Sequence, residues 1–259
     1  MNQAERRLFL IKNLISEQTQ YQNIRIPKDE TEQKRLLRAL FNIRMSMPAS
    51  EDFLAVQDAY LQEETKCKEI TEISDLDPIA AGLYLWQGDI TTLRCDAIVN
   101  AANSQMLGCF CPNHGCIDNA IHTYAGVQLR LACAELMKRQ GHEEETGKAK
   151  ITPAFNLPCN YVIHTVGPIV RGQPAKKDKE LLASCYRSCL ELADQNGLKS
   201  MAFCCISTGE FHFPNDKAAQ IAIQTVKDYK AQTHSEIEVI FNVFKETDYN
   251  IYRELLGTN

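Results

Sequence analysis

The sequence has no long apolar run. Its uninterrupted hydrophobic stretches span only a few residues each, whereas a membrane-spanning helix needs about 20. Residues 1–7 are mostly polar and do not form the apolar segment of a secretory leader. We therefore expect no membrane contact and a cytoplasmic location.

Blocks of basic residues are also missing. The 28 lysines and arginines are outnumbered by 33 acidic residues, which gives a formal net charge of −5, and they are scattered along the chain. Domains that bind nucleic acid usually carry a basic patch. We therefore expect no nucleic-acid partner.

Cysteine, by contrast, is abundant. The chain has 11 in 259 residues, an odd number spread through predicted strands and helices. This pattern is typical of reduced thiols and not of a disulfide framework. With 44% hydrophobic residues, the chain can bury a full core in one larger domain with an appendage.

Residues 1 to about 63 are predicted to be helical, because their apolar residues recur every three or four positions. These residues are Leu8, Ile11, Leu14, Ile15, Leu36, Leu37, Leu40, Phe41, Ile43, Phe53, Val56, Tyr60 and Leu61. A charged stretch at 63–78 then resembles a linker. We assign residues 1–75 to a helical N-terminal extension with its linker, and 76–259 to the main domain. We expect the extension to act as structural cover, with a partner-docking surface as the alternative.

In the main domain, strands alternate with helices. Apolar runs bounded by turn residues predict strands at 83–87, 97–99, 161–166, 201–206 and 237–243. Helical patterns lie at 118–140 (one helix or two abutting ones), at 178–196, from about 215, and at 249–256. This alternation predicts an α/β fold, an α/β/α sandwich with mostly parallel strands covered on both faces.

The connection at 100–119 runs from a strand's carboxyl end to a helix's amino end, which is where open α/β sheets bind ligands. Within it, Cys109, His114 and Cys116 form a C-x4-H-x-C array. Sulfur and imidazole nitrogen are ligands that zinc prefers, and three protein ligands would leave a fourth position open, as in catalytic sites. The alternative is a set of ordinary small buried cysteines.

Other cysteines and histidines of the sequence are either further metal ligands or core residues. Cys111 is a possible ligand in place of Cys109, ranked second because Pro112 is expected to turn it away. His122 lies on the apolar face of its predicted helix, so we expect a core residue and not a ligand. The cysteines at 185 and 189 are one helical turn apart without further ligands nearby, which favours core packing.

Two more strand ends carry polar groups. Asp89 follows the strand at 83–87, and its carboxylate can accept a hydrogen bond from an amino group such as that of adenine, or cap a turn. The small-residue loop at 207–209 joins a strand to a helix, which exposes backbone N–H groups to phosphate oxygens, although it is also simply a good turn. Phe211 and Phe213 beside it are candidates for stacking on a ribose or base.

Taken in order, these segments resemble the macrodomain family, whose members bind ADP-ribose. The matching motifs are Gly88-Asp89-Ile90-Thr91, Asp96-Ala97-Ile98-Val99-Asn100-Ala101-Ala102-Asn103-Ser104, Ile117-Asp118-Asn119-Ala120-Ile121-His122, Val162-Ile163-His164-Thr165-Val166-Gly167-Pro168 and Ile206-Ser207-Thr208-Gly209. The resemblance covers residues 83–256 and implies a macrodomain-like three-layer α/β/α sandwich.

The same resemblance implies roles for single residues. Asp89, with Ile90, would contact adenine, and Asn103 and Asp118 would face the distal ribose. The diphosphate loop would consist of Ser207, Thr208, Gly209, Glu210 and Phe211. One position departs from the family, because glycine is common where this chain has His212.

The segment 108–116 replaces the run of glycines that many hydrolytic macrodomains have. It is similar to a zinc-containing microbial subclass with Gly-Cys-Phe, then His, then Cys-Ile-Asp-Asn. That similarity implies one zinc ion per chain on Cys109, His114 and Cys116, and a helical N-terminal extension. It also implies a partnership with a sirtuin-type ADP-ribosyltransferase and a lipoyl-carrier protein substrate.

We therefore predict a zinc-dependent hydrolase that removes mono-ADP-ribose from acidic side chains of modified proteins. Asn103 would orient the distal ribose, and Asp118 would hold that ribose or assist proton transfer. The alternatives are a non-catalytic reader of ADP-ribose, in which zinc braces the loop, and a deacylase of O-acyl-ADP-ribose.

Overall fold

A seven-stranded sheet forms the centre of the part of the chain that the computed structural model describes, residues 1–257. The strand order is β2-β3-β9-β8-β5-β7-β6; the inner five are parallel, and β2 and β6 pair antiparallel at the two edges. The strands are β2 (Pro78–Ala80), β3 (Leu83–Gln87), β5 (Ala97–Ala102), β6 (Ala149–Pro153), β7 (Tyr161–Val166), β8 (Ser200–Phe203) and β9 (Glu238–Val243). A short parallel pair consists of β1 (Thr71–Glu72) and β4 (Leu93–Arg94).

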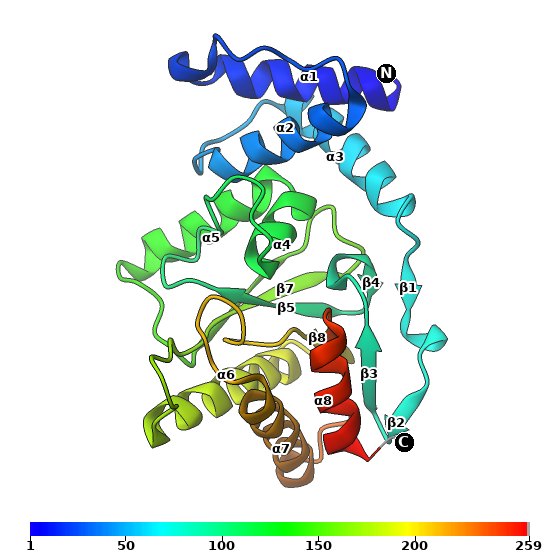
Figure 1. Cartoon of the computed structure of the whole chain (residues 1–259), viewed down its shortest axis with the longest axis vertical. Coiled ribbons are helices and arrows are strands. Elements are labelled where there is room, and N and C mark those ends of the chain that lie inside the picture. Colours follow the sequence, from blue (N-terminus) through cyan, green and yellow to red (C-terminus); the bar gives the residue numbers. More distant parts are fainter. Residues whose placement is uncertain (258–259) are drawn as a thin grey trace.

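Helices cover both faces of this sheet (Figure 1). On one face lie α4 (Ile117–Ala125) and α5 (Val127–Gln140), and on the other α6 (Lys176–Gln195), α7 (Asn215–Thr233) and α8 (Glu246–Leu256). The extension consists of α1 (Gln3–Ser16), α2 (Glu30–Ile43) and α3 (Glu51–Lys66), and it stacks on the side of α4 and α5. The molecule is thus a three-layer α/β/α sandwich with a helical extension, as predicted.

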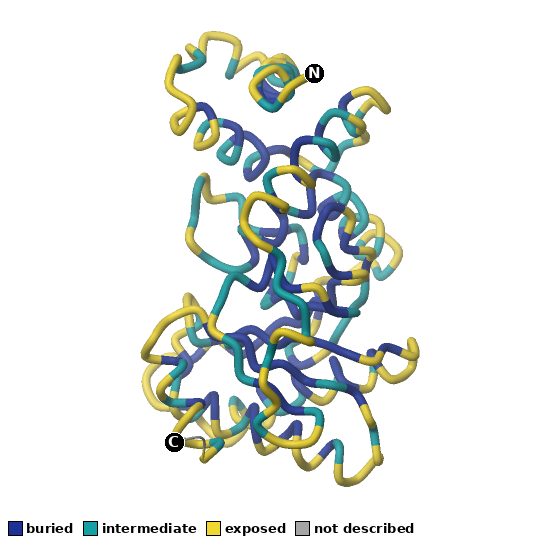
Figure 2. Tube along the Cα trace, turned by 90° about the vertical axis from the view of Figure 1, so that its right-hand side faces the viewer, coloured by how far each residue is buried: buried dark blue, intermediate teal, exposed yellow. Residues whose placement is uncertain are grey.

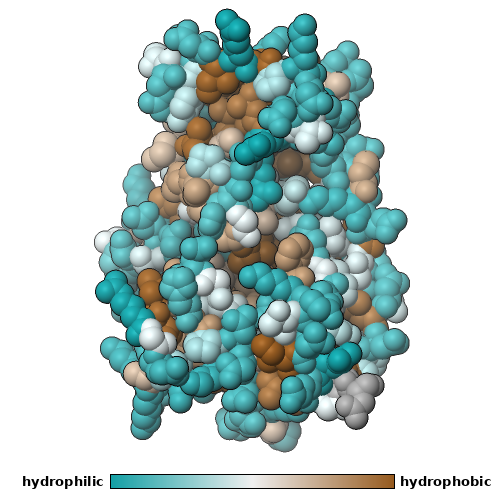
Figure 3. Space-filling view, viewed as in Figure 1, coloured by the Kyte–Doolittle hydropathy of each residue, from teal (hydrophilic) through white to brown (hydrophobic). Residues whose placement is uncertain are grey.

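The extension helices begin where the sequence offers caps. Asn2, Asp29 and Ser50 each accept a hydrogen bond from a backbone N–H in the first turn of α1, α2 and α3. Their apolar faces meet in a core of their own, which reaches the main domain at Val127 of α5. Figure 2 shows these helices with one buried and one exposed side, and Figure 3 shows apolar side chains gathered among hydrophilic ones over the extension.

Most predicted elements are confirmed, with shifted ends. The helical pattern at 118–140 is two helices, because Gly126 between α4 and α5 has φ +95°, which an L side chain rarely adopts. The strand predicted at 201–206 ends at Phe203, so the loop that follows it begins earlier than expected. The prediction missed edge strand β6 and the short strands. Among residues 1–257, none of the helices could cross a bilayer on grounds of length and apolar character.

Candidate functional site

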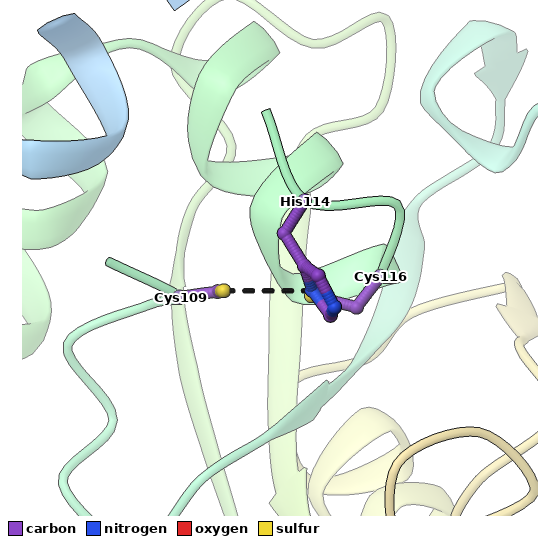
Figure 4. Close-up of side chains that lie close together, drawn as sticks. All are labelled: Cys109, His114 and Cys116. Atoms are coloured by element: carbon purple, nitrogen blue, oxygen red, sulfur yellow. Dashed lines mark hydrogen bonds between the residues drawn. The ribbon is translucent and has the colours of Figure 1, made fainter. Parts of the chain in front are cut away.

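Cys109, His114 and Cys116 converge beyond the carboxyl end of β5 (Figure 4). Their ligand atoms all lie within 4.8 Å of one another, and Cys109 Sγ is 3.7 Å from His114 Nδ1. Sulfur and nitrogen ligands of one tetrahedral zinc are about 3.6 Å apart, given bonds of about 2.3 and 2.1 Å. The three side chains therefore fit a zinc ion and would leave its fourth position open.

The start of α4 positions Cys116. This residue is the N-cap of the helix, and its Sγ accepts a hydrogen bond from Asn119 N at 3.4 Å. Burial is the main cause that raises the pKa of the Cys116 thiol to about 12, and the thiol of Cys109 raises it further. A divalent cation would displace the proton of the Cys116 thiol, and its positive charge would offset the repulsion between two neighbouring thiolates. Cys111 is exposed and lies outside the cluster.

The chain enters the loop of residues 109–116, which carries the candidate metal ligands and is called the metal loop below, through a tight turn. Gly108 has φ +78°, and a Cβ there would lie 2.7 Å from Cγ of His122, so only glycine fits. Asn103, half-buried before the turn, donates from Nδ2 to the carbonyl of Gly108 at 3.2 Å and accepts at Oδ1 from Gln105 N at 3.0 Å. Its amide therefore shapes the turn that leads to Cys109.

Asp118 lies in the first turn of α4 and is buried. Its Oδ1 accepts a hydrogen bond from Asn100 Nδ2 at 2.8 Å and lies 3.5 Å from His122 Nε2. Burial raises the pKa of Asp118 to about 6, against the hydrogen bond from Asn100. The carboxyl group is thus buried at the start of α4 and fixed in place by Asn100.

Beneath Asp118 lies a second group of polar side chains that the sequence reasoning did not bring together. The ligand atoms of His122, Cys133 and His164 lie within 4.8 Å of one another, and all three side chains are buried. His164 bonds through its ring nitrogens to Asn100 at 3.2 Å and Thr152 at 2.9 Å. His122 is in the core, where we expected it, whereas Cys133 comes from the next helix, α5, and His164 from the more distant strand β7.

The buried imidazole of His164 predicts a loss of stability in acid. Burial lowers its pKa from 6.5 to about 3, so the unfolded chain binds a proton near pH 6.5 that the folded chain excludes until about pH 3. The contribution of His164 to stability is fully present above pH 6.5 and falls by about 1.4 kcal/mol per pH unit below it. Asp118, with its raised pKa, acts in the opposite sense between about 6 and 3.8.

The variant His164→Gln isolates this contribution. The free energy of unfolding is measured in urea at pH 6.5, 5.5 and 4.5 for both proteins. We expect it to fall more steeply with decreasing pH in the wild type than in the variant, by up to about 1.4 kcal/mol per pH unit. The variant's absolute stability does not enter the comparison. Equal slopes would mean that the fold does not lower the pKa of His164.

Asp89 stands at the end of β3, which β9 and β8 separate from β5 and the metal loop. Its Oδ1 accepts from Thr91 N at 3.0 Å and Thr91 Oγ1 at 2.6 Å, and its Oδ2 lies 3.2 Å from Lys68 Nζ. Burial raises its pKa, but the bonds from Thr91 and the charge of Lys68 outweigh burial and hold it below its usual range. Lys68 Nζ also lies 3.4 Å from the ring centroid of Tyr124.

The loop after β8 has a strained course. Ser207 has φ +66° and His212 has φ +56°, the conformation that explains why glycine is common at the latter position. Ser207 Oγ is buried and has no hydrogen-bond partner in the described part of the chain. Phe213 is buried in the core, so the prediction that it stacks on a ligand is wrong, whereas Phe211 is half-exposed.

The metal loop and the loop after β8 meet, because β5 and β8 are neighbours in the sheet. His114 Nε2 lies 3.5 Å from Oε1 of Glu210. The other ring nitrogen of His114 faces Cys109, so a metal on Nδ1 would leave Nε2–H free to donate to the Glu210 carboxylate. The sequence placed Glu210 among ligand-binding residues but gave no sign of this contact.

The fold and these loops define a class: an α/β/α sandwich with polar loops after β3, β5 and β8, at the carboxyl ends of its parallel strands, one of which carries a cluster of two thiols and an imidazole. Residues 99–222 match the family model "Macro domain". A "Protein-ADP-ribose hydrolase" of Treponema medium is 57% identical, over 99% of this chain and 100% of its own length. The chain belongs to the macrodomain family.

Two further similarities extend this result. A solved structure of a mutant Oceanobacillus iheyensis macrodomain with ADPR is 40% identical, with a TM-score of 0.64, over 70% of this chain and 96% of its own. A "Probable bifunctional ADP-ribose hydrolase/ADP-ribosyltransferase" of Fusarium oxysporum f. sp. cubense is 43% identical over 86% of this chain, which spans 40% of that relative.

Proposed function

We propose that this protein is a zinc-dependent hydrolase that removes mono-ADP-ribose from acidic side chains of modified proteins. The observation that carries the proposal is the meeting of the metal cluster with the diphosphate loop, where His114 Nε2 lies 3.5 Å from Glu210 Oε1. A nucleotide whose diphosphate lay along that loop would present its distal ribose to the metal cluster. The Treponema relative, named a protein-ADP-ribose hydrolase, supports the reaction class.

The binding residues follow from the positions of the loops. Asp89 would hold the adenine at the β3 end, with only the backbone of Ile90 available because its side chain is buried in the core, and residues 207–211 would hold the diphosphate through backbone N–H groups. The buried hydroxyl of Ser207, which lacks a partner among the described residues, is available for a phosphate oxygen. The Oceanobacillus macrodomain, solved with ADPR, supports this ligand.

Cleavage of an ester between a carboxylate and the ribose needs a polarised carbonyl or an activated water. Zinc with an open position supplies one or the other when bound, as a Lewis acid or by lowering the pKa of water to about 7. Cys109, His114 and Cys116 would hold it. Asn103 orients the distal ribose from the turn before the metal loop, and Asp118 holds that ribose or moves a proton at its carboxyl group.

The modified protein is the expected partner. A lipoyl-carrier protein modified by a sirtuin-type transferase is our candidate substrate, and a cytoplasmic location is part of the same proposal. The Fusarium relative supports a link to a transferase, because its name joins an ADP-ribose hydrolase with an ADP-ribosyltransferase.

A comparison of linkages tests the proposal. The purified, zinc-loaded protein is given three substrates: a protein mono-ADP-ribosylated on carboxylates, one modified on serine, and free O-acetyl-ADP-ribose. We expect ADP-ribose release from the carboxylate-linked protein and none from the serine-linked one, because only the former is an ester of a carboxylic acid.

The other outcomes identify the rivals. A protein that binds ADP-ribose and zinc but releases nothing from the three substrates is a reader. Faster turnover of free O-acetyl-ADP-ribose than of the modified protein, at equal concentrations, assigns it to acyl-ADP-ribose deacylation.

A further inference from the structure

Helix α2 of the N-terminal extension contacts the backbone of the metal loop. Asn42, in the last turn of α2, is 1% exposed. Its Oδ1 accepts a hydrogen bond from Asn113 N at 2.9 Å, and its Nδ2 donates to Thr123 Oγ1 of α4 at 2.9 Å. One amide thus ties the residue before His114 to the helix that begins at Cys116.

Arg38, one helical turn before Asn42, contacts the other side of His114. Its Nη2 donates to the carbonyl of His114 at 3.0 Å and to Asn119 Oδ1 at 2.9 Å, and its Nε donates to the same Oδ1 at 3.2 Å. Asn119 in turn donates from Nδ2 to Cys111 O at 3.0 Å and from its backbone to Cys116 Sγ at 3.4 Å. The guanidinium therefore connects the backbone of one ligand to the thiol of another.

The loop between these contacts has little regular structure of its own. Residues 109–116 contain no helix or strand, and Asn113 has φ +56°, a conformation that residues other than glycine adopt uncommonly, asparagine more often than most. The loop itself contributes the bond from His114 N to Cys111 O at 3.2 Å. Its shape around His114 thus depends on partners outside it, and α2 supplies these on both sides of the ligand.

We propose that Arg38 and Asn42 are positioning residues of the metal centre, which makes α2 of the extension a structural part of the site. The inference rests on the proposed zinc site. Ligands held near their bound geometry lose less conformational freedom when the metal binds. The hydrogen bonds of Arg38 and Asn42 therefore raise metal affinity. Partners that orient metal ligands typically contribute 10- to 100-fold to metal affinity.

The experiment measures zinc affinity in the full-length, metal-stripped protein by competition with a chromophoric chelator, without substrate. The test variants are Arg38→Gln and Asn42→Leu. The matched controls are Arg44→Gln and Asn156→Leu. Arg44 is a buried arginine at the end of α2 that bonds to Glu17, and Asn156 bonds α3 to the main domain at Asp58; neither side chain contacts the loop.

We expect the test variants to bind zinc 10- to 100-fold more weakly and the controls within about threefold of wild type. Affinity for ADP-ribose in the metal-free protein, which reports the fold, should not change in either set. If Asn42→Leu does not fold, Arg38→Lys serves, because an ammonium group lacks the Nε–H that gives the guanidinium its second bond to Asn119 Oδ1, and an intermediate loss is expected.

Test variants that bind zinc as tightly as the controls would overturn the proposal, and so would equal losses in both sets. Wild type that binds no zinc overturns both this inference and the zinc-dependent function. Wild type that binds zinc but releases no ADP-ribose from any substrate overturns the hydrolase alone, since the affinity comparison does not use turnover.

Discussion

Cys116→Ala is expected to remove zinc from the protein and to lower ADP-ribose release by about a thousandfold, the rate equivalent of several kcal/mol of lost charge stabilisation. Cys116 supplies one of the three ligand atoms that lie within 4.8 Å of one another. A catalytic zinc site has three protein ligands and one open position, and the two ligands that remain in this variant are too few to hold the ion. Zinc content by mass spectrometry and turnover are to be measured on the same samples.

The thiol of Cys116 also caps α4, so loss of the metal must be separated from loss of the cap. Cys116→Ser keeps an oxygen that can accept the hydrogen bond from Asn119 N, and serine is among the best N-caps, but its hydroxyl is a poor zinc ligand. We expect Cys116→Ser to fold like wild type and to lose zinc and turnover together. Full turnover without zinc would show that the metal has no catalytic role and at most supports the structure of the loop.

Cys111→Ala is the control for ligand choice. Cys111 is exposed and outside the cluster, so this variant should keep zinc and activity, whereas Cys109→Ser should lose both. The reverse pattern would exchange the two ligands. It would also mean that the metal loop changes its conformation when the metal binds, because the hydrogen bond from Asn119 Nδ2 to the Cys111 carbonyl fixes the loop in its present conformation.

The sequence predicts the loops of this site better than it predicts their surroundings. Parallel strands carry their carboxyl ends to one edge, so Asp89, the loop after β5 and the loop after β8 could be placed together from strand patterns alone. Three polar ligands within eight residues are visible in a linear sequence. The strand β6 was missed because its polar, partly exposed residues at a sheet edge give no apolar run.

Contacts between distant elements had no such signal. Arg38 and Asn42 lie on a helix that reads as simple amphipathic cover, and nothing in their spacing points to His114. Glu210 reaches the same histidine from the loop after the neighbouring strand β8, and Lys68 reaches Asp89 from what looked like a plain charged linker. Local pattern fixes which face of a helix is buried, but not which loop it meets.

Asp89→Ala is expected to weaken ADP-ribose binding by about 10- to 100-fold, because a hydrogen bond to a charged group contributes about 1.5–3 kcal/mol. Thr91 occupies Oδ1, so adenine's amino group must use Oδ2, which now faces Lys68. Lys68→Met keeps an unbranched side chain, one atom shorter and without charge, and frees Oδ2. It should therefore leave affinity unchanged or raise it, opposite in sign to Asp89→Ala.

Calorimetry with ADP-ribose and with its hypoxanthine analogue, in which a carbonyl replaces the amino group, separates recognition of the base from a change in fold. Asp89→Ala should lose affinity for ADP-ribose and little for the analogue, and at saturating substrate its turnover should approach that of wild type, because Asp89 lies away from the metal loop. Equal losses for both ligands would remove the adenine contact from Asp89. A loss of affinity in Lys68→Met would instead make the lysine part of the nucleotide site, with the linker of the extension closing over the base.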